Sequence, residues 1–385
     1  MEDAAKNFGA KLDRLIAGES LSREEAREMF SQVISDEQPD VHQGAFLAAI
    51  TAKGPTSDEI AGGWDAIYGL DTFKASPRVS GELFENCGTG MDAVETFNIS
   101  TAASIVAAAA GVPMAKHGAR AITSRCGTVD ILEVFGVEVE ADPEIVVRSI
   151  ERAGIGIFNG TSPKVHPLGL GRILAKIRFG TVLNISGSLA NPAMPRQGLR
   201  GVYSKDLVVT IAEAMKKIGY SRAMVVHGLS ADGKRGMDEV SPSGKTFVAE
   251  FGEDGRIATF EVSPRDFGAG SVDENLLIPR EDRVEEAVEL LRVLSGMERG
   301  PREMAVCINS APVLKMAGKA EDLSEGFSIS REIIRTGKAI EKLGEWVRAQ
   351  NSDPLAGAER LKYLVERAAK TETEFIGHRL REESR

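Results

Sequence analysis

The pattern of apolar residues changes near Pro77, and this change constrains the fold more than any other feature of the chain. Before it, amphipathic stretches follow two helix-capping signatures, Ser22-Arg-Glu-Glu25 and Thr56-Ser-Asp-Glu59. After it, short β-type runs alternate with helical stretches long enough to serve as crossover connections. This order predicts an α/β protein: a small N-terminal helical domain, then a larger α/β domain around a central, mostly parallel sheet.

The expected boundaries follow from these patterns. We expect the helical domain over residues 1–75, the α/β domain over 76–348 and a helical or flexible extension over 349–385, with a helix over 163–179 contributing to the helical domain. The predicted strands cover 154–158, 180–184, 223–227, 247–251 and 257–261. The last two flank Glu253-Asp-Gly255, which indicates a hairpin.

Charge and cysteine content exclude several classes of protein. The chain carries 47 Lys and Arg against 57 Asp and Glu, a net charge of −10 that disfavours nucleic acid and anionic lipid as partners. Its three cysteines are far apart and form no CxxC pair, as expected in a reducing compartment. No signal-peptide pattern starts the chain, and its longest apolar run, 101–112, is too short to span a bilayer. We therefore expect a cytoplasmic protein without a membrane segment.

The stretch from Cys87 to Ala102 carries the clearest chemical signal. Its loop Gly88-Thr-Gly90 can turn backbone N–H groups toward an anion, because glycine has no Cβ to obstruct the approach. Asn98-Ile-Ser-Thr101 then supplies a cap and hydroxyls before an alanine-rich helix, whose positive end faces the same place. Together they indicate a phosphate or diphosphate site, although a GTG tripeptide alone is typical of an ordinary turn.

Two further segments fit the same chemistry. Lys116-His-Gly-Ala-Arg120 and Ser124-Arg-Cys-Gly127 are basic and contain glycine, which favours phosphate binding over plain surface turns. Asp238 and Glu239 follow the strand predicted at 223–227. Such a pair is commonly a solvated turn, but at the end of a parallel strand its hard oxygen donors indicate Mg²⁺ shared with substrate phosphates.

Taken in order, these motifs resemble those of the anthranilate phosphoribosyltransferase family, within the nucleoside phosphorylase and phosphoribosyltransferase class. The resemblance is carried by GTGxDxxxTFNIST, KHG and Gly236-Met-Asp-Glu-Val-Ser241, and it extends from AGESLSREEA to Gly318-Lys-Ala320. It implies transfer of a 5-phosphoribosyl group from phosphoribosyl diphosphate to the nitrogen of an aromatic acceptor, by default anthranilate in tryptophan biosynthesis. It also implies Mg²⁺ as cofactor and a homodimer.

The resemblance further implies roles for individual positions. For phosphoribosyl diphosphate these are Gly88, Thr89, Gly90, Asp92, Thr96, Asn98, Ser100, Thr101, Lys116 and Ser124. For the acceptor they are His117, Gly118, Ala119, His166, Lys176 and Gly187. For the metal they are Ser100, Asp238 and Glu239. His117 and His166 are also candidates for assisting proton loss from the amine, the alternative being packing histidines.

The acceptor side departs from the family pattern. Met91 stands at the fourth position of the motif, where the family has the third glycine of GTGGD, and Ala119 replaces the Asn of KHGN. The family's carboxylate-binding Arg has no clear counterpart: counting back from Asn184 reaches Leu174, while counting forward from His166 reaches Lys176. Arg172 and Arg178 are further candidates, if either side chain turns inward. Lysine is a weaker partner than arginine for a carboxylate. The acceptor is therefore left open between anthranilate and a related aromatic or heterocyclic amine.

Two other functions are compatible with this scaffold. One is a non-catalytic relative that binds a ligand or nucleic acid, but the acidic composition and the retained Ser100, Lys116, Asp238 and Glu239 argue against it. The other is a nucleoside phosphorylase, which fits the GTGxD, NIST and acidic-pair motifs less well.

Overall fold

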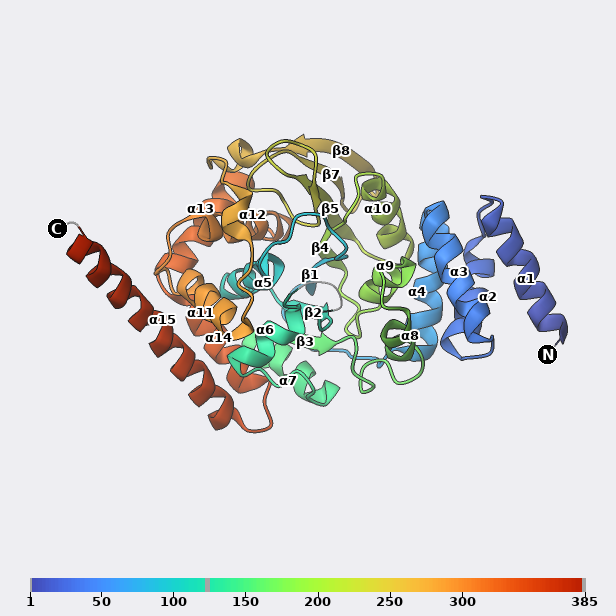
Figure 1. Ribbon diagram of the computed structural model, residues 1–385, viewed down its shortest axis with the longest axis horizontal. Helices are drawn as coiled ribbons and strands as arrows, with labels where there is room; N and C mark the ends of the chain where they lie inside the picture. The colour runs from blue at the N-terminus through green and yellow to red at the C-terminus, as the bar shows by residue number, and fades with distance from the viewer. Residues whose placement is uncertain (1, 122–124, 383–385) are drawn as a thin grey trace.

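A small helical domain forms one end of the molecule (Figure 1). The structure, a computed structural model, describes residues 2–121 and 125–382. The chain begins with α1 (Glu2–Ile16), α2 (Arg23–Ile34), α3 (Asp40–Lys53) and α4 (Ser57–Asp71). Ser22 and Glu25 form a reciprocal capping box on α2, and Thr56 and Glu59 form one on α4. The helical start predicted from the sequence is confirmed.

An eight-stranded mixed sheet forms the centre of the larger domain, in the order β3-β2-β1-β4-β5-β7-β8 with β6 beside β5. The strands are β1 (Phe84–Gly88), β2 (Met114–Gly118), β3 (Ile155–Asn159), β4 (Gln197–Gly201), β5 (Arg222–Leu229), β6 (Gly236–Met237), β7 (Thr246–Phe251) and β8 (Ile257–Val262). The five strands from β3 to β5 pair in parallel, whereas β6, β7 and β8 join antiparallel. The predicted mostly parallel sheet is confirmed.

The chain changes its direction of travel across the sheet between β1 and β4. From β1 it moves outward to β2 and β3, then returns to β4 on the other side of β1 and continues to β5. At such a switch point, the loops at the carboxyl ends of neighbouring strands separate and leave a crevice for a ligand. Gly88 and Gly201 are register partners at these ends, so they mark the place where a site is expected.

Helices cover both faces of the sheet. They are α5 (Ile99–Ala109), α6 (Thr128–Phe135), α7 (Pro143–Ala153), α8 (Leu170–Ile177), α9 (Val182–Leu189), α10 (Leu207–Lys217), α11 (Arg283–Leu294), α12 (Pro301–Met316), α13 (Leu323–Arg335) and α14 (Lys338–Ala349), with short 3₁₀ helices at Pro264–Phe267 and Glu274–Leu277. On β5, Met224 and Val226 pack into the core shared with α5 and α11 to α14. Ala223 and Val225 face the opposite core, shared with α10 and the helical domain. The alternation is the period of two expected for a strand buried on both faces.

The sequence-based strand predictions are confirmed at β3, β5 and the β7–β8 hairpin. The strand predicted at 180–184 is wrong, because this segment begins helix α9: the Thr181 hydroxyl accepts a hydrogen bond from the Leu183 N–H, and Asn184 reciprocates at the Thr181 N–H. Leu183 and Ile185 are buried against the helical domain, so packing outweighs their β-type appearance.

Helices α8 and α9 extend the helical domain toward the sheet. Leu170 and Ile173 of α8 share a core with Phe30 and Phe46 of α2 and α3. Helices α8 and α9 therefore pack on the helical domain, and residues of both line the pocket at the switch point. The crevice is consequently bounded by both domains.

The C-terminal segment is the long helix α15 (Pro354–Glu382), which lies at the end of the molecule opposite α1 (Figure 1). Leu361 and Leu364 are buried in the core of the larger domain, whereas Tyr363 is 63% exposed. Within the described chain, no helix combines the length and apolar character needed to cross a membrane.

Candidate active site

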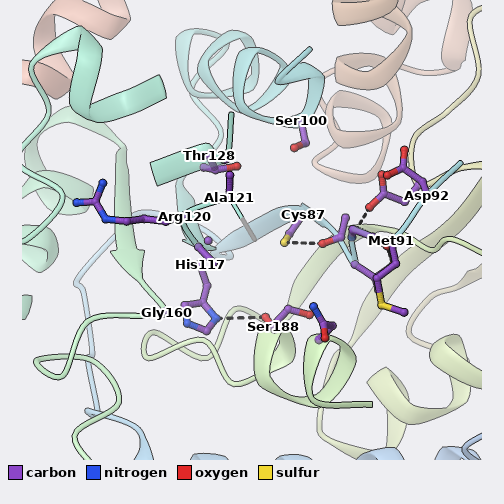
Figure 2. A pocket seen from close by; sticks show the side chains of 18 of the residues that line it. Cys87, Met91, Asp92, Ser100, His117, Arg120, Ala121, Thr128, Gly160 and Ser188 are labelled. Carbon is purple, nitrogen blue, oxygen red and sulfur yellow. Dashed lines mark hydrogen bonds between the residues drawn. The ribbon is translucent and has the colours of Figure 1, made fainter. Parts of the chain in front are cut away.

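A pocket of about 290 Å³ lies at the switch point. Its walls come from the glycine-rich loop after β1, the end of β2, the segment after β6, and helices α8 and α9. The loop and the carboxylates of Asp238 and Glu239 form one part, which we call the donor half; α8, α9, Met91 and the His117–Ala119 segment form the acceptor half. Figure 2 shows how Asp92, Ser100, His117 and Ser188 are arranged around it.

The glycine-rich loop is shaped around Asp238. The Gly90 N–H donates to Asp238 Oδ2 at 2.6 Å, and the Thr89 N–H donates to the Gly201 carbonyl at 3.1 Å. A Cβ on Gly88 would lie 2.1 Å from Asp238 Oδ2, so only glycine allows this approach. The loop and the acidic pair are therefore one unit, although they are far apart in sequence.

Three carboxyl groups of this unit, those of Asp92, Asp238 and Glu239, have raised pKa values. Burial, reinforced by the charge of Asp238, raises the pKa of Asp92 to about 8. Burial also raises the pKa of Asp238, and burial with the charges of Asp238 and Asp92 raises that of Glu239. Among the described residues no salt bridge joins any of these three carboxylates to a cation. A divalent cation would supply the missing positive charge.

The donor set fits Mg²⁺ rather than a tightly caged metal. Within the described residues there is no cluster of three or more His, Cys, Asp or Glu side chains arranged to hold an ion. Asp238, Glu239 and the Ser100 hydroxyl instead provide a few hard oxygen donors beside one cavity. Mg²⁺ commonly binds through one or two carboxylates and completes its shell with water and substrate phosphates.

The start of α5 contributes part of the expected phosphate site. Thr96, Asn98 and Ser100 line the pocket, and the Ser100 N–H donates to Glu239 Oε1 at 3.2 Å. Asn98 stands at the N-cap without a side-chain capping bond and donates instead to the Cys126 carbonyl. Thr101 is fully buried with its hydroxyl 3.3 Å from that of Thr128, so the structure does not place it at the pocket surface. Ser124 lies outside the described residues.

Lys116 belongs to strand β2 rather than to a glycine-containing turn. Its side chain is only 2% exposed, and its ammonium donates to the Asn86 carbonyl at 2.8 Å and to the Ser104 hydroxyl at 3.2 Å. Burial lowers its pKa, against the opposing influence of Cys87 and Glu239. It borders the pocket as a buried positive charge beneath the donor half.

His117 and His166 form a buried pair. Their Nε2 atoms are 3.0 Å apart, His117 Nδ1 is 3.3 Å from the Ser188 carbonyl, and His166 Nδ1 is 2.8 Å from the Asp71 carbonyl. Burial lowers the pKa of His117 to about 4, and burial with the neighbouring His117 lowers that of His166 to about 3. Both rings are thus neutral near pH 7. His117 lines the pocket, as Figure 2 shows. His166 is not among the lining residues and contacts His117 through Nε2.

Apolar side chains dominate the remaining wall. Leu170, Leu174 and Leu183 line it, together with the backbone of Gly118, Ala119 and Gly187. Met91 adopts a left-handed backbone (φ 71°), which few residues other than glycine adopt readily. Its side chain reaches across to Gly180, where an added Cβ would meet the Met91 methyl at 2.3 Å. Sequence reasoning singled out Met91 but could not find this contact.

The basic side chains near α8 do not enter the pocket. Lys176 is exposed and pairs with Asp40 of α3, so the structure does not bring it to the acceptor half. Arg172 pairs with Asp36 and donates to the Val33 carbonyl, and Arg178 donates to the Ala175 carbonyl. The position favoured by the backward count, Leu174, is the one that lines the cavity.

One buried ion pair beneath the floor escaped sequence reasoning. Arg200 of β4 donates to Glu85 at 2.8 Å, with both side chains 1% exposed, and it also donates to the Ser188 hydroxyl at 3.2 Å. The Tyr220 hydroxyl donates to the same Glu85 carboxylate. An isolated Arg and Glu on separate strands carry no pairing signal in the sequence.

Comparison with protein families places both parts of the chain. Residues 80–340 match the model of the glycosyl transferase family a/b domain, and residues 11–68 match that of the glycosyl transferase family helical bundle domain.

Individual relatives agree with the family models. The chain is similar to the anthranilate phosphoribosyltransferases of Desulfosudis oleivorans, with 36% identity over 90% of this chain and 99% of the relative, and of Agrobacterium fabrum, with 37% identity over 89% and 98%. Among solved structures it resembles the Thermus thermophilus enzyme, with a TM-score of 0.78, 32% identity and coverage of 88% and 98%. The Saccharomyces cerevisiae enzyme in complex with phosphoribosyl diphosphate and Mg has a TM-score of 0.77 at 24% identity over 90% and 99%, a likeness of fold.

Proposed function

The chain belongs to the anthranilate phosphoribosyltransferase family, and from this membership we propose that it transfers a 5-phosphoribosyl group from phosphoribosyl diphosphate to the nitrogen of an aromatic amine. Anthranilate, which the relatives' names give, is the reference acceptor. The family favours this transfer over a nucleoside phosphorylase or a non-catalytic binding protein.

One observation supports the proposal above the others. Two buried carboxylates without a partner cation, Asp238 and Glu239, face a glycine-rich loop and the start of helix α5 in a single pocket. Backbone N–H groups and a helix N-terminus attract a diphosphate, while the carboxylates attract a divalent cation. A substrate that carries a diphosphate bridged by Mg²⁺ satisfies both at once.

The reaction forms a bond from the amine nitrogen to C1′ of the ribose and breaks the bond from C1′ to the diphosphate oxygen. Diphosphate leaves with the bonding electron pair, and the amine loses a proton to solvent or to the departing diphosphate. Asp238 and Glu239 would hold Mg²⁺, which would supply positive charge to stabilise the leaving diphosphate. The residues of the chain hold the two substrates in line and exclude water, which would otherwise attack C1′.

The two histidines have a positioning role in this scheme. Both ring nitrogens of His117 and of His166 face a partner within 3.3 Å, so neither ring presents a free nitrogen to the acceptor. We therefore assign His117 to the shape of the pocket wall and His166 to the orientation of His117, rather than to proton transfer.

The test is diphosphate release from phosphoribosyl diphosphate, measured with and without an aromatic amine and with and without Mg²⁺. We expect release only when both are present, and abolition of release by EDTA with recovery on excess Mg²⁺. Release that ignores the amine, or phosphate-dependent cleavage of nucleosides, would overturn the proposal.

We also propose a cytoplasmic homodimer that associates through the helical domain. Ile16 of α1 and Val41 of α3 are 68% and 75% exposed, which leaves apolar surface on the outer side of that domain. Sedimentation equilibrium of the wild type and of an Ile16→Glu, Val41→Glu variant tests this: the wild type should be dimeric and the variant shifted toward monomer.

A further inference from the structure

The acceptor half of the pocket contains no positive charge that could meet a carboxylate. Of the described residues that line the whole pocket, only Lys116 and Arg120 are cations. The Lys116 ammonium already bonds Asn86 and Ser104. Arg120 pairs with Glu133 and Glu140, and Figure 2 shows it extending away from Ser188 and Met91. Both are therefore engaged elsewhere.

The cations just outside the lining are paired or kept away from it. Arg200 lies behind Ser188, is 1% exposed and pairs with Glu85; its Nε has no hydrogen-bond partner, but Arg200 is not among the residues that line the pocket. Arg125 pairs with Glu95, and Lys176 pairs with Asp40. The three residues outside the described part of this loop, 122–124, are Ile, Thr and Ser, which carry no charge. Four acidic residues line the same cavity: Asp92, Glu95, Asp238 and Glu239.

The polar groups that the acceptor half does present are neutral. His117 is uncharged near pH 7. Asn184 of α9 accepts the Thr181 N–H through its carbonyl oxygen. Its amide nitrogen, within the described residues, donates no hydrogen bond, so this N–H group is available to a carbonyl oxygen or ring nitrogen of a ligand. The Ser188 hydroxyl is also neutral and already bonds the Ile185 carbonyl and Arg200. The large apolar side chains of this wall are Leu170, Leu174, Leu183 and Met91.

We propose that the acceptor is an uncharged aromatic amine that bears a neutral hydrogen-bond acceptor, such as an amide or a ring nitrogen, rather than an amine that bears a carboxylate. A carboxylate moved into this cavity would lose its hydration and find no counter-charge, whereas a neutral ring loses little and gains contact with the leucines and Met91. This inference rests on the proposed phosphoribosyl transfer and specifies its acceptor.

The test compares two acceptors of nearly the same shape, anthranilate and 2-aminobenzamide, which differ in charge. With phosphoribosyl diphosphate and Mg²⁺ in excess, we expect kcat/KM for diphosphate release to be at least about tenfold higher for the amide. Equal values or a preference for anthranilate would overturn the inference while leaving the proposed transfer intact.

Direct binding separates the two ideas if turnover is slow. Calorimetric titration of each compound into the protein with phosphoribosyl diphosphate and Mg²⁺ should give the tighter Kd for 2-aminobenzamide. Tighter binding of 2-aminobenzamide, together with no release of diphosphate in the presence of any amine, would support the uncharged acceptor and contradict the proposed phosphoribosyl transfer. Tighter binding of anthranilate would contradict the uncharged acceptor whatever the rate.

A charge-insertion variant provides the reciprocal test. Leu174→Arg places a guanidinium on the lining of the acceptor half, and Ala175→Arg places the same group on the exposed side of α8. We expect Leu174→Arg to shift the ratio of kcat/KM toward anthranilate by at least about tenfold and Ala175→Arg to leave it unchanged. An equal shift in both variants would show that overall charge, not the pocket, sets the preference.

Discussion

The two halves of the pocket use opposite physical means to prepare for their ligands. In the donor half, burial crowds three carboxylates and raises the pKa of each, so a bound cation would stabilise their ionised form. In the acceptor half, burial lowers the pKa of both histidines, so this half is neutral. In both halves, loss of water around the side chain disfavours its charged form. Only in the donor half, where three carboxyl groups lie together, would a metal ion compensate for the charge. Binding of the charged diphosphate and metal is thus assigned to one half of the cavity, and binding of the aromatic ring to the other.

The largest effect is expected from removing the charge of the donor half. Asp238→Asn with Glu239→Gln should reduce Mg²⁺-dependent diphosphate release by at least about a hundredfold, because these are the main groups available to hold the metal. The free energy of unfolding, measured in urea, should not fall, since ionised carboxylates with raised pKa values oppose folding. Unchanged turnover in this variant would remove both residues from the metal site.

A smaller loss is expected from displacing one carboxylate without changing its charge. In Gly88→Ala the new Cβ would lie 2.1 Å from Asp238 Oδ2, so the loop or the carboxylate must move. We expect roughly a tenfold loss of turnover and a cost of about 1–3 kcal/mol in stability. Gly252→Ala is the control, because nothing lies within 4 Å of its added Cβ. If both variants behave alike, the close approach to Asp238 has no functional consequence.

The neutral half can be tested through the pH dependence of stability. Both histidines have folded-state pKa values below the ordinary value near 6.5, at about 4 and about 3. Their contribution is therefore complete above pH 6.5 and is lost as pH falls toward 4, by about 3 kcal/mol per fully buried ring. Urea unfolding of the wild type between pH 7 and 4 should show this decline.

A double variant identifies the source of that decline. His117→Asn with His166→Asn should be less stable at pH 7 but should lose less further stability between pH 6.5 and 4. A decline as steep as that of the wild type would mean that other groups cause it, and the neutral state of the pair would lose its support.

The smallest effect concerns the residue that sequence alignment offered as the acceptor's cation. Lys176→Ala should change kcat/KM for either acceptor by less than about twofold and stability by less than about 0.5 kcal/mol, because the side chain is exposed and pairs with exposed Asp40. A large rise in KM for anthranilate would show that Lys176 reaches the pocket when anthranilate is bound. The acceptor half would then contain a positive charge and could no longer be called neutral.

Local signals predicted much of this molecule. Capping boxes at Ser22 and Thr56 fixed helix starts, and the hairpin around Glu253-Asp-Gly255 was visible as a turn between two β-type runs. The glycine-rich loop and the acidic pair were recognised as separate motifs. Such features act over a few residues, so a linear reading can find them.

Longer-range features escaped that reading. The segment 180–184 looked like a strand because its β-branched and apolar residues fit either state, and only packing against the helical domain decided for α9. Lys116 looked like a loop cation because nothing nearby in sequence shows that Asn86 and Ser104 would bury its ammonium. In both cases the deciding partner is remote in the chain.

The sequence by itself determined the family, the two kinds of domain and the presence of the donor motifs, because these depend on local periodicity and on ordered short patterns. Only the tertiary structure decided which residues face the acceptor. Counting along the chain left Leu174 and Lys176 as equal alternatives, since a shortened segment has no unique alignment. Residues two apart lie on different faces of helix α8. Leu174 therefore lines the cavity, whereas Lys176 lies outside it and pairs with Asp40.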